Sequence, residues 1–145
     1  MKRKDWIIVV VIAIALVIAA YLALMFTWRS YYNRGTDHMN NREYDRAILC
    51  FNKAIKINWR FAEAYCNRGI AYCEKGECDR AILDFDKAIE IRPEFAEAYG
   101  SRAIAYYDKQ EYDEASADVR KAQSLGHRVP PDFLDALGEA SGPEK

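Results

Sequence analysis

The side chains best suited to metal or redox chemistry in this sequence are its four cysteines and two histidines. They are Cys50, Cys66, Cys73, Cys78, His38 and His127. Neither a CxxC pair nor the ligand spacing of a zinc site occurs among them, so we expect no metal ion and no cofactor. Cys66 and Cys73 lie seven residues apart, about 10 Å along a helix, which is too far for a disulfide within that helix. Thiol chemistry at these two cysteines remains the enzymatic alternative.

No other set of residues indicates catalysis. The sequence has no pairing of a nucleophile with a base, no glycine-rich phosphate loop and no acid dyad. Beyond residue 5 the chain carries 18 Lys and Arg against 21 Asp and Glu, and this mildly acidic balance argues against nucleic-acid binding. We therefore predict that the protein is not an enzyme.

The elements that position these residues begin with an apolar N-terminal segment. Residues 6–26 contain no charged side chain, and a helix of that length crosses a hydrocarbon core of roughly 30 Å. Trp6 and Trp28 flank the segment at the headgroup level, and basic residues lie just outside it: Lys2, Arg3, Lys4 and Arg29. A cleaved signal peptide is the alternative, but its apolar region is usually only about 7–15 residues long. We predict a single-pass membrane protein with residues 6–26 as an uncleaved anchor.

The orientation of this anchor is predicted from the charges at its two ends. Three basic residues on a very short tail favour a cytoplasmic N-terminus, so that residues 1–27 form the cytoplasmic tail and the anchor. The rest of the chain then faces the periplasm or a lumen. The opposite orientation stays open, because Arg29, Arg34 and Arg42 follow the anchor at comparable distances and the cysteines fit a reducing compartment.

The rest of the chain repeats itself with a period of 34 residues. FAEAY at 61–65 recurs at 95–99, and DRAIL at 45–49 recurs at 79–83. Aromatic and small residues follow one another along a helical stripe, and the small positions are Gly35, Gly69 and Ala103. Each unit is therefore predicted to be a helix, a tight turn and a second helix.

Turn, cap and charged residues also recur with this period. Asp45, Asp79 and Asp113 each precede an apolar run and are expected to cap the second helix of their unit. Gly76 suits the end of a first helix. Arg34, Arg68 and Arg102 occur once per unit, and we expect them to pair with acids as part of the packing between repeats.

This pattern resembles the tetratricopeptide repeat family, most closely in the middle copy at 62–95. Together with the apolar segment, the resemblance implies an all-α chain: an N-terminal transmembrane helix, an α-solenoid of three helix-turn-helix repeats and a short C-terminal capping helix. The repeats are expected at 28–61, 62–95 and 96–129, the capping helix at 130–138 and a disordered tail at 139–145. Gly35 is the only glycine or proline between residues 6 and 38, so the anchor is expected to continue into the first repeat helix.

In this family the first helices of successive repeats line a concave face that receives a peptide. The resemblance assigns to this face Tyr32, Thr36, Met39, Glu63, Cys66, Ile70, Cys73, Glu97, Ile104, Tyr107 and Asp108. Apolar side chains flanked by carboxylates suit a partner segment with apolar residues and Lys or Arg. Chaperone-binding members instead hold an acidic peptide with lysines, an arginine and asparagines. The matching positions here carry Tyr32, Thr36, Asn67, Glu97 and Ser101, so an acidic chaperone tail is expected to be repelled.

The predicted function is therefore a membrane-anchored scaffold for protein–protein interaction that binds a partner protein or peptide on the concave face. The alternative is a structural subunit or self-associating assembly factor of a larger membrane complex, which stacks its repeats and leaves the groove unused. A homo-oligomer fits that alternative. Nucleic acid is not an expected partner.

Overall fold

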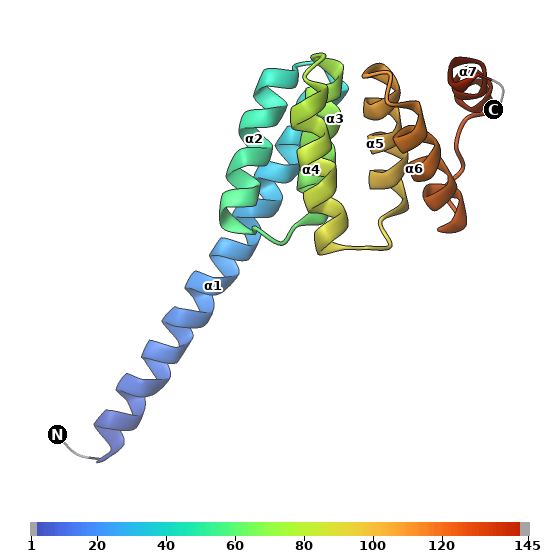
Figure 1. Cartoon of the computed structure of the whole chain (residues 1–145). Coiled ribbons are helices and arrows are strands. Elements are labelled where there is room, and N and C mark those ends of the chain that lie inside the picture. The colour runs from blue at the N-terminus through green and yellow to red at the C-terminus, as the bar shows by residue number, and fades with distance from the viewer. Residues whose placement is uncertain (1–2, 143–145) are drawn as a thin grey trace.

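Residues 3–142 are described by a computed structural model, and they form seven α-helices and no strand. The helices are α1 (Arg3–Asn40), α2 (Tyr44–Ile57), α3 (Ala62–Glu74), α4 (Cys78–Ile91), α5 (Ala96–Asp108), α6 (Tyr112–Ser124) and α7 (Pro131–Ser141). The first half of α1 projects as a rod, and the other helices stack beside its second half, with α7 at the far end (Figure 1). The predicted all-α solenoid of helical hairpins is confirmed.

Each hairpin packs a small residue of its first helix against the second helix. A Cβ atom added to Gly35 on α1 would lie 2.5 Å from Cε1 of Phe51, and one added to Gly69 on α3 would lie 2.7 Å from Cε1 of Phe85. In the third hairpin Ala103 takes the glycine position, and the buried residue that corresponds to the phenylalanines is the smaller Val119. The extra methyl group of alanine is therefore matched by a smaller partner in its own repeat.

The turns inside the hairpins require a left-handed backbone. Gly76 has φ 75° at the end of α3, as the sequence predicted. Arg42 and Gln110 take the corresponding positions with φ 58° and 64°. In the second turn the N–H group of Gly76 donates to the carbonyl of Cys73 at 2.8 Å, which satisfies one of the last carbonyls of the helix.

The prediction that Asp45, Asp79 and Asp113 cap the second helices is wrong. These helices begin two residues earlier than expected, at Tyr44, Cys78 and Tyr112, and the aspartates are their second residues. The Asp45 carboxylate instead accepts a hydrogen bond from Nζ of Lys75 at 2.7 Å, and Asp79 pairs with Lys109 at 2.9 Å. The aspartates of the first two repeats therefore connect each turn to the turn of the next repeat.

The recurring arginines connect the two helices of a hairpin and also adjacent hairpins. Arg68 donates from Nε and Nη2 to the Asp84 carboxylate at 2.7 and 2.6 Å, and from Nη1 to the side-chain oxygen of Asn52 at 2.5 Å. Arg102 makes the same paired contact with Asp118, at 2.7 and 2.8 Å.

The predicted ion pair between repeats is formed by Arg102, whose Nη1 also donates to the Asp86 carboxylate on α4. Arg34 is exposed, and Cys50 stands where the other repeats have the buried aspartate. The guanidinium groups of the second and third repeats therefore serve packing, and the first repeat does not reproduce this arrangement.

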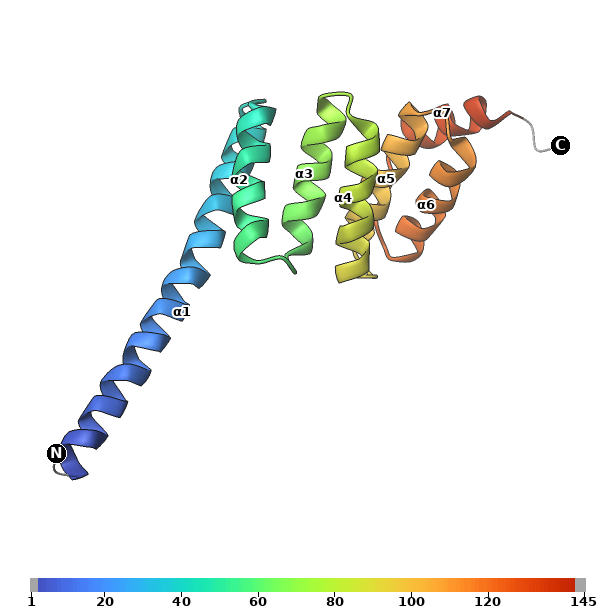
Figure 2. The same cartoon turned by 60° about the vertical axis from the view of Figure 1, so that its left-hand side comes forward.

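The N-terminal helix is continuous from the apolar segment into the first hairpin, as predicted. Within the described chain, α1 is the one helix that is long and apolar enough to cross a membrane. No part of its most apolar stretch is buried against the rest of the structure. Length and composition alone also fit a signal sequence near an N-terminus. In Figures 1 and 2 this half of α1 touches no other helix.

The last helix, α7, covers the apolar end of the third repeat. Leu137 is buried, and Phe133 and Leu134 pack against the same core. The predicted end of this helix at residue 138 is wrong, because α7 continues to Ser141, whose hydroxyl donates to the carbonyl of Gly138. The helix ends before Gly142, which has φ 72°. Of the predicted disordered tail, residues 143–145 lie outside the described residues.

Candidate functional site

The concave side of the solenoid is formed by the second half of α1, by α3 and by α5, which contact one another directly. All the residues that the sequence assigned to the groove come from these three helices. The structure shows two hollows along this side, one at each end, and it places the assigned residues in three different environments.

The first hollow lies where α1 meets the start of α3. It has a volume of about 320 Å³ and is lined by Trp28, Arg29, Tyr32, Asn33, Phe61 and Glu63. The Tyr32 ring packs against Phe61, with centroids 4.7 Å apart, and its hydroxyl accepts a hydrogen bond from Nδ2 of Asn67 at 3.0 Å. Burial raises the pKa of Tyr32, so the phenol stays neutral. Thr36 donates to the Tyr32 carbonyl at 3.2 Å and does not line the hollow.

The carboxylate of Glu63 in this hollow is already paired. It accepts a hydrogen bond from Nη1 of Arg92 at 2.8 Å, and the same guanidinium lies 3.6 Å from the ring centroid of Phe95. The expected row of groove acids is therefore interrupted. Glu97 and Asp108 on α5 are exposed and can face a cationic partner.

The second hollow lies at the C-terminal end of the groove and is larger, at about 480 Å³. Its walls are Glu97, Gly100, Ser101 and Ile104 from α5, His127, Arg128, Val129 and Pro130 from the segment before α7, and Phe133 from α7 itself. Ile104 is 46% exposed, which is high for a large apolar side chain in a helix that packs on both sides. Glu97 and Ile104 thus form one wall of a hollow whose opposite wall was not predicted.

The missed wall depends on the glycine at position 100. A Cβ atom there would lie 2.9 Å from Nε2 of His127, so a larger residue would displace this ring from its place against α5. The corresponding residues of the earlier repeats are Tyr32 and Cys66. The residue at this repeat position becomes smaller from the first repeat to the third. That decrease is the feature of the sequence that could have indicated that another segment packs closely against α5.

One residue assigned to the groove belongs to the core instead, and another is partly covered. Cys66 is 1% exposed and lies among the buried residues shared by the second and third repeats, so a partner cannot contact it. Tyr107 packs between Tyr112 and Phe133, with ring centroids 5.6 and 5.4 Å away. The assignment of Cys66 is therefore wrong, because α5 covers it, whereas Tyr107 keeps part of its surface exposed beside α7.

Three further assigned residues are only partly accessible. Met39, Ile70 and Cys73 pack against the central core cluster and keep part of their surface exposed. Burial raises the pKa of Cys73 to about 12 and also raises the pKa of Cys66, which disfavours the reactive thiolate. Thiol chemistry at this pair therefore has no support from the structure.

Metal ligands and acid clusters give no competing site in the described part of the chain. Among residues 3–142 no group of three or more His, Cys, Asp and Glu side chains is arranged to hold a metal ion. All four cysteines are free thiols.

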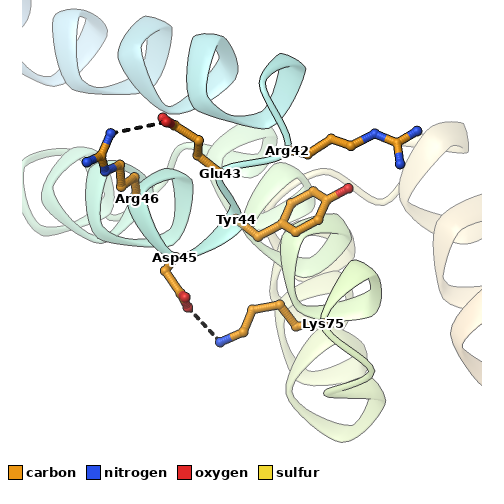
Figure 3. Close-up of a pocket in the computed structure, with 6 residues that line it drawn as sticks. All are labelled: Arg42, Glu43, Tyr44, Asp45, Arg46 and Lys75. Atoms are coloured by element: carbon orange, nitrogen blue, oxygen red, sulfur yellow. Dashed lines mark hydrogen bonds and ion pairs between the residues drawn. The ribbon is translucent and has the colours of Figure 1, made fainter.

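A third hollow, of about 290 Å³, lies at the turn between α1 and α2. It is lined by Arg42, Glu43, Tyr44, Asp45, Arg46 and Lys75 (Figure 3). Most of its charges are paired within it: Arg46 with Glu43 at 3.1 Å and Lys75 with Asp45 at 2.7 Å. These side chains connect neighbouring turns, and the hollow offers little unpaired charge to a ligand.

The stacked hairpins and their concave side define a class of protein, the helical-repeat solenoids that serve as interaction scaffolds. Within that class the chain belongs to the tetratricopeptide repeat family, whose models match residues 28–58, 62–95 and 96–125. No curated protein sequence matches the chain.

Solved structures with the same fold include separate TPR domains and a longer chain. The Arabidopsis OM64 TPR domain is 28% identical, with a TM-score of 0.75 over 79% of this chain and 96% of that one. MamA is 35% identical, with a TM-score of 0.66 over 69% of this chain and 58% of MamA. The first TPR of Spaghetti (RPAP3), solved with the HSP90 peptide SRMEEVD, is 22% identical, with a TM-score of 0.73 over 79% and 90%.

Proposed function

We propose that this protein is a membrane-anchored interaction scaffold that binds a partner protein or peptide in the groove between α5 and the segment before α7. The fold supports the general role, since relatives with this fold have been solved with bound peptides. The exposed apolar half of α1 supports anchoring by residues 6–26. The repeat units at 28–61, 62–95 and 96–129 form the scaffold.

The observation that carries the proposal is the C-terminal hollow. Its volume of about 480 Å³ accommodates an apolar side chain against Ile104, and Glu97 stands beside it. An apolar residue next to Lys or Arg is the segment that this pairing fits. The acidic peptide held by the RPAP3 domain is a poor fit here, because Glu97 would repel it.

Photo-crosslinking in native membranes tests this proposal. A photoreactive amino acid at position 104 should capture the partner, whereas the same amino acid in place of the exposed Arg120 on α6 should not. Ile104→Asp should weaken capture by roughly thirtyfold or more, the usual effect of losing a central apolar contact worth about 2 kcal/mol. Equal capture from both positions, or wild-type binding by Ile104→Asp, would count against the groove.

A second candidate function, self-association by repeat stacking, is favoured by two exposed leucines. Leu49 on α2 and Leu83 on α4 occupy corresponding positions and are 60% and 69% exposed. A homo-oligomer through this face predicts that Leu49→Gln with Leu83→Gln lowers the mass of the detergent-solubilised particle while Ile104→Asp does not. If the Leu49→Gln, Leu83→Gln variant and the Ile104→Asp variant are both monomers, stacking through this face is excluded.

The predicted topology has its own test. With the N-terminus in the cytoplasm, the repeats lie in the periplasm or a lumen. A membrane-impermeant thiol reagent applied to intact cells should then label a cysteine introduced by Ser141→Cys, because position 141 is exposed. Labelling only after lysis would place the repeats in the cytoplasm. Extraction by alkaline carbonate, or a mature N-terminus beyond residue 26, would indicate a signal sequence in place of an anchor.

A further inference from the structure

The loop between α2 and α3, residues 58–61, lies beside the end of the apolar segment of α1. Tyr21, Leu24 and Trp28 of α1 line a hollow of about 280 Å³ together with Ile57 and Asn58. In both views this loop is at the end of the repeats from which the free half of α1 projects (Figures 1 and 2). Part of the first repeat is therefore level with the last turns of the apolar segment.

Ring contact fixes the depth of this loop relative to α1. The rings of Trp28 and Phe61 meet edge to face, with centroids 4.6 Å apart. Leu24 and Trp28 are separated by about 6 Å of helical rise, and the headgroup layer on each side of a bilayer is about 5–8 Å thick. When residues 6–26 span the hydrocarbon core, the loop lies within this layer.

The side chains that the loop exposes match a headgroup layer. Trp59 is 61% exposed, and the Arg60 guanidinium lies 5.5 Å from the centroid of its ring. Lys53 and Lys56 are exposed on the adjoining turns of α2, and residues 47–62 contain no Asp or Glu. Indole rings prefer the headgroup level, and basic side chains are attracted to anionic lipids.

The fold itself does not require tryptophan at this position. Pro93 occupies the same place in the next repeat and is followed by Glu94. The residues just before these two positions have nearly the same backbone, with φ −126° and ψ 85° at Asn58 and φ −135° and ψ 91° at Arg92. The α4–α5 loop is also farther from the free half of α1 (Figure 2). Of these two loops, the one nearer the anchor exposes an indole beside a basic side chain, and the other has Pro93 and Glu94 at these positions.

We propose that residues 58–61 form a second membrane contact, in which Trp59 and Arg60 enter a layer of anionic phospholipid headgroups. The contact rests on the proposed anchoring by residues 6–26. It holds the first repeat against the bilayer at two points, the anchor and the loop, and so fixes which side of the solenoid faces the membrane.

Tryptophan fluorescence of the full-length chain in vesicles tests this contact. Trp6→Phe and Trp28→Phe leave Trp59 as the only tryptophan and keep an aromatic ring against Phe61. In vesicles of phosphatidylcholine with phosphatidylglycerol, Trp59 should be quenched by lipids brominated near the headgroup and protected from aqueous acrylamide. Arg60→Gln should weaken association of the loop with this surface by roughly fivefold, and its effect should vanish in pure phosphatidylcholine.

The matched control moves the reporter by one repeat. In the Trp6→Phe, Trp28→Phe background, Trp59→Pro with Pro93→Trp places the only tryptophan on the corresponding turn, where acrylamide should reach it freely. Equal acrylamide quenching at positions 59 and 93, without quenching by brominated lipid, would overturn the loop contact.

The anchor is measured separately with Trp6 as the only tryptophan. Quenching of Trp6 by bromolipids together with an accessible Trp59 would refute the loop contact and leave the anchor standing. Failure of vesicles to retain the chain would refute both.

Discussion

The tight contact between Gly69 and Phe85 makes a strong prediction about stability. In Gly69→Ala the new Cβ would lie within 3.0 Å of three ring atoms of Phe85, the nearest at 2.7 Å, and this ring is completely buried. Overpacking of this kind costs about 1–3 kcal/mol, while alanine gains about 1 kcal/mol over glycine in a helix. We expect a net loss of up to about 2 kcal/mol in the free energy of unfolding.

The third repeat supplies the compensating change. Because it pairs Ala103 with Val119, Phe85→Val should make room for alanine at position 69. Phe85→Val alone leaves a cavity, and its cost should stay below the about 3–5 kcal/mol of a Phe→Ala change. In the Phe85→Val background Gly69→Ala should become neutral or stabilising, so the double-mutant cycle should show a coupling energy of about 1–3 kcal/mol.

Urea unfolding of the full-length chain in detergent micelles, followed by circular dichroism, measures all four corners of the cycle. Gly138→Ala in α7 is the control, since no atom lies within 4 Å of the added Cβ and the change should stabilise the protein by up to about 1 kcal/mol. If Gly69→Ala has the same effect in the wild-type background and in the Phe85→Val background, the steric explanation for the small-residue column is refuted.

Three other predictions concern packing, thiols and acid stability. Ala81→Leu, at a fully buried site, should lower the unfolding free energy by about 1–3 kcal/mol; an unchanged melting temperature would contradict the packing described. Because burial raises the pKa of Cys66 and Cys73, iodoacetamide at pH 7 should alkylate both slowly until the protein is denatured, and rapid native labelling would disprove their burial. The hydrogen bond from Lys75 lowers the pKa of Glu77, so the ionised Glu77 carboxylate stabilises the folded state. This stabilisation is complete above pH 4.5 and is lost as the pH falls through the lower pKa of the folded state. Glu77→Gln should therefore reduce the fall in melting temperature below pH 4.5.

The solenoid could be predicted from the sequence because the residue types that recur every 34 positions are the ones that helix packing requires. The small residues at 35, 69 and 103 mark where two helices meet, and their spacing of 34 residues fixes the hairpins. The column does not fix where a helix starts. Asp45 was expected at the cap, but the helix begins at Tyr44 and the carboxylate reaches Lys75 in the next repeat. An aspartate at this position can either cap its own helix or bond to the next repeat. The periodic sequence alone does not show which of these two contacts forms.

The groove was predicted less well, because its surface depends on how tightly neighbouring first helices approach. Ile104 and Glu97 are accessible as expected. Cys66 is covered because α3 and α5 are in direct contact, and Tyr107 is partly covered because α7 brings Phe133 against it. The wall formed by His127 comes from the end of the third repeat, where the corresponding residues of the earlier repeats are Trp59 and Pro93. Its position follows from a contact with Gly100, which the periodicity does not encode.

The continuous α1 helix couples the orientation of its apolar half to the position of the repeats. Its 38 residues extend for about 57 Å without an internal break, so a change in the tilt of the apolar half must move the repeats at the other end. An apolar stretch longer than the local hydrocarbon thickness tilts, and a thicker bilayer reduces that tilt. If residues 6–26 anchor the chain as proposed, the height of the C-terminal hollow above the membrane depends on the thickness of the bilayer, and lipid composition then affects which partners the protein can reach.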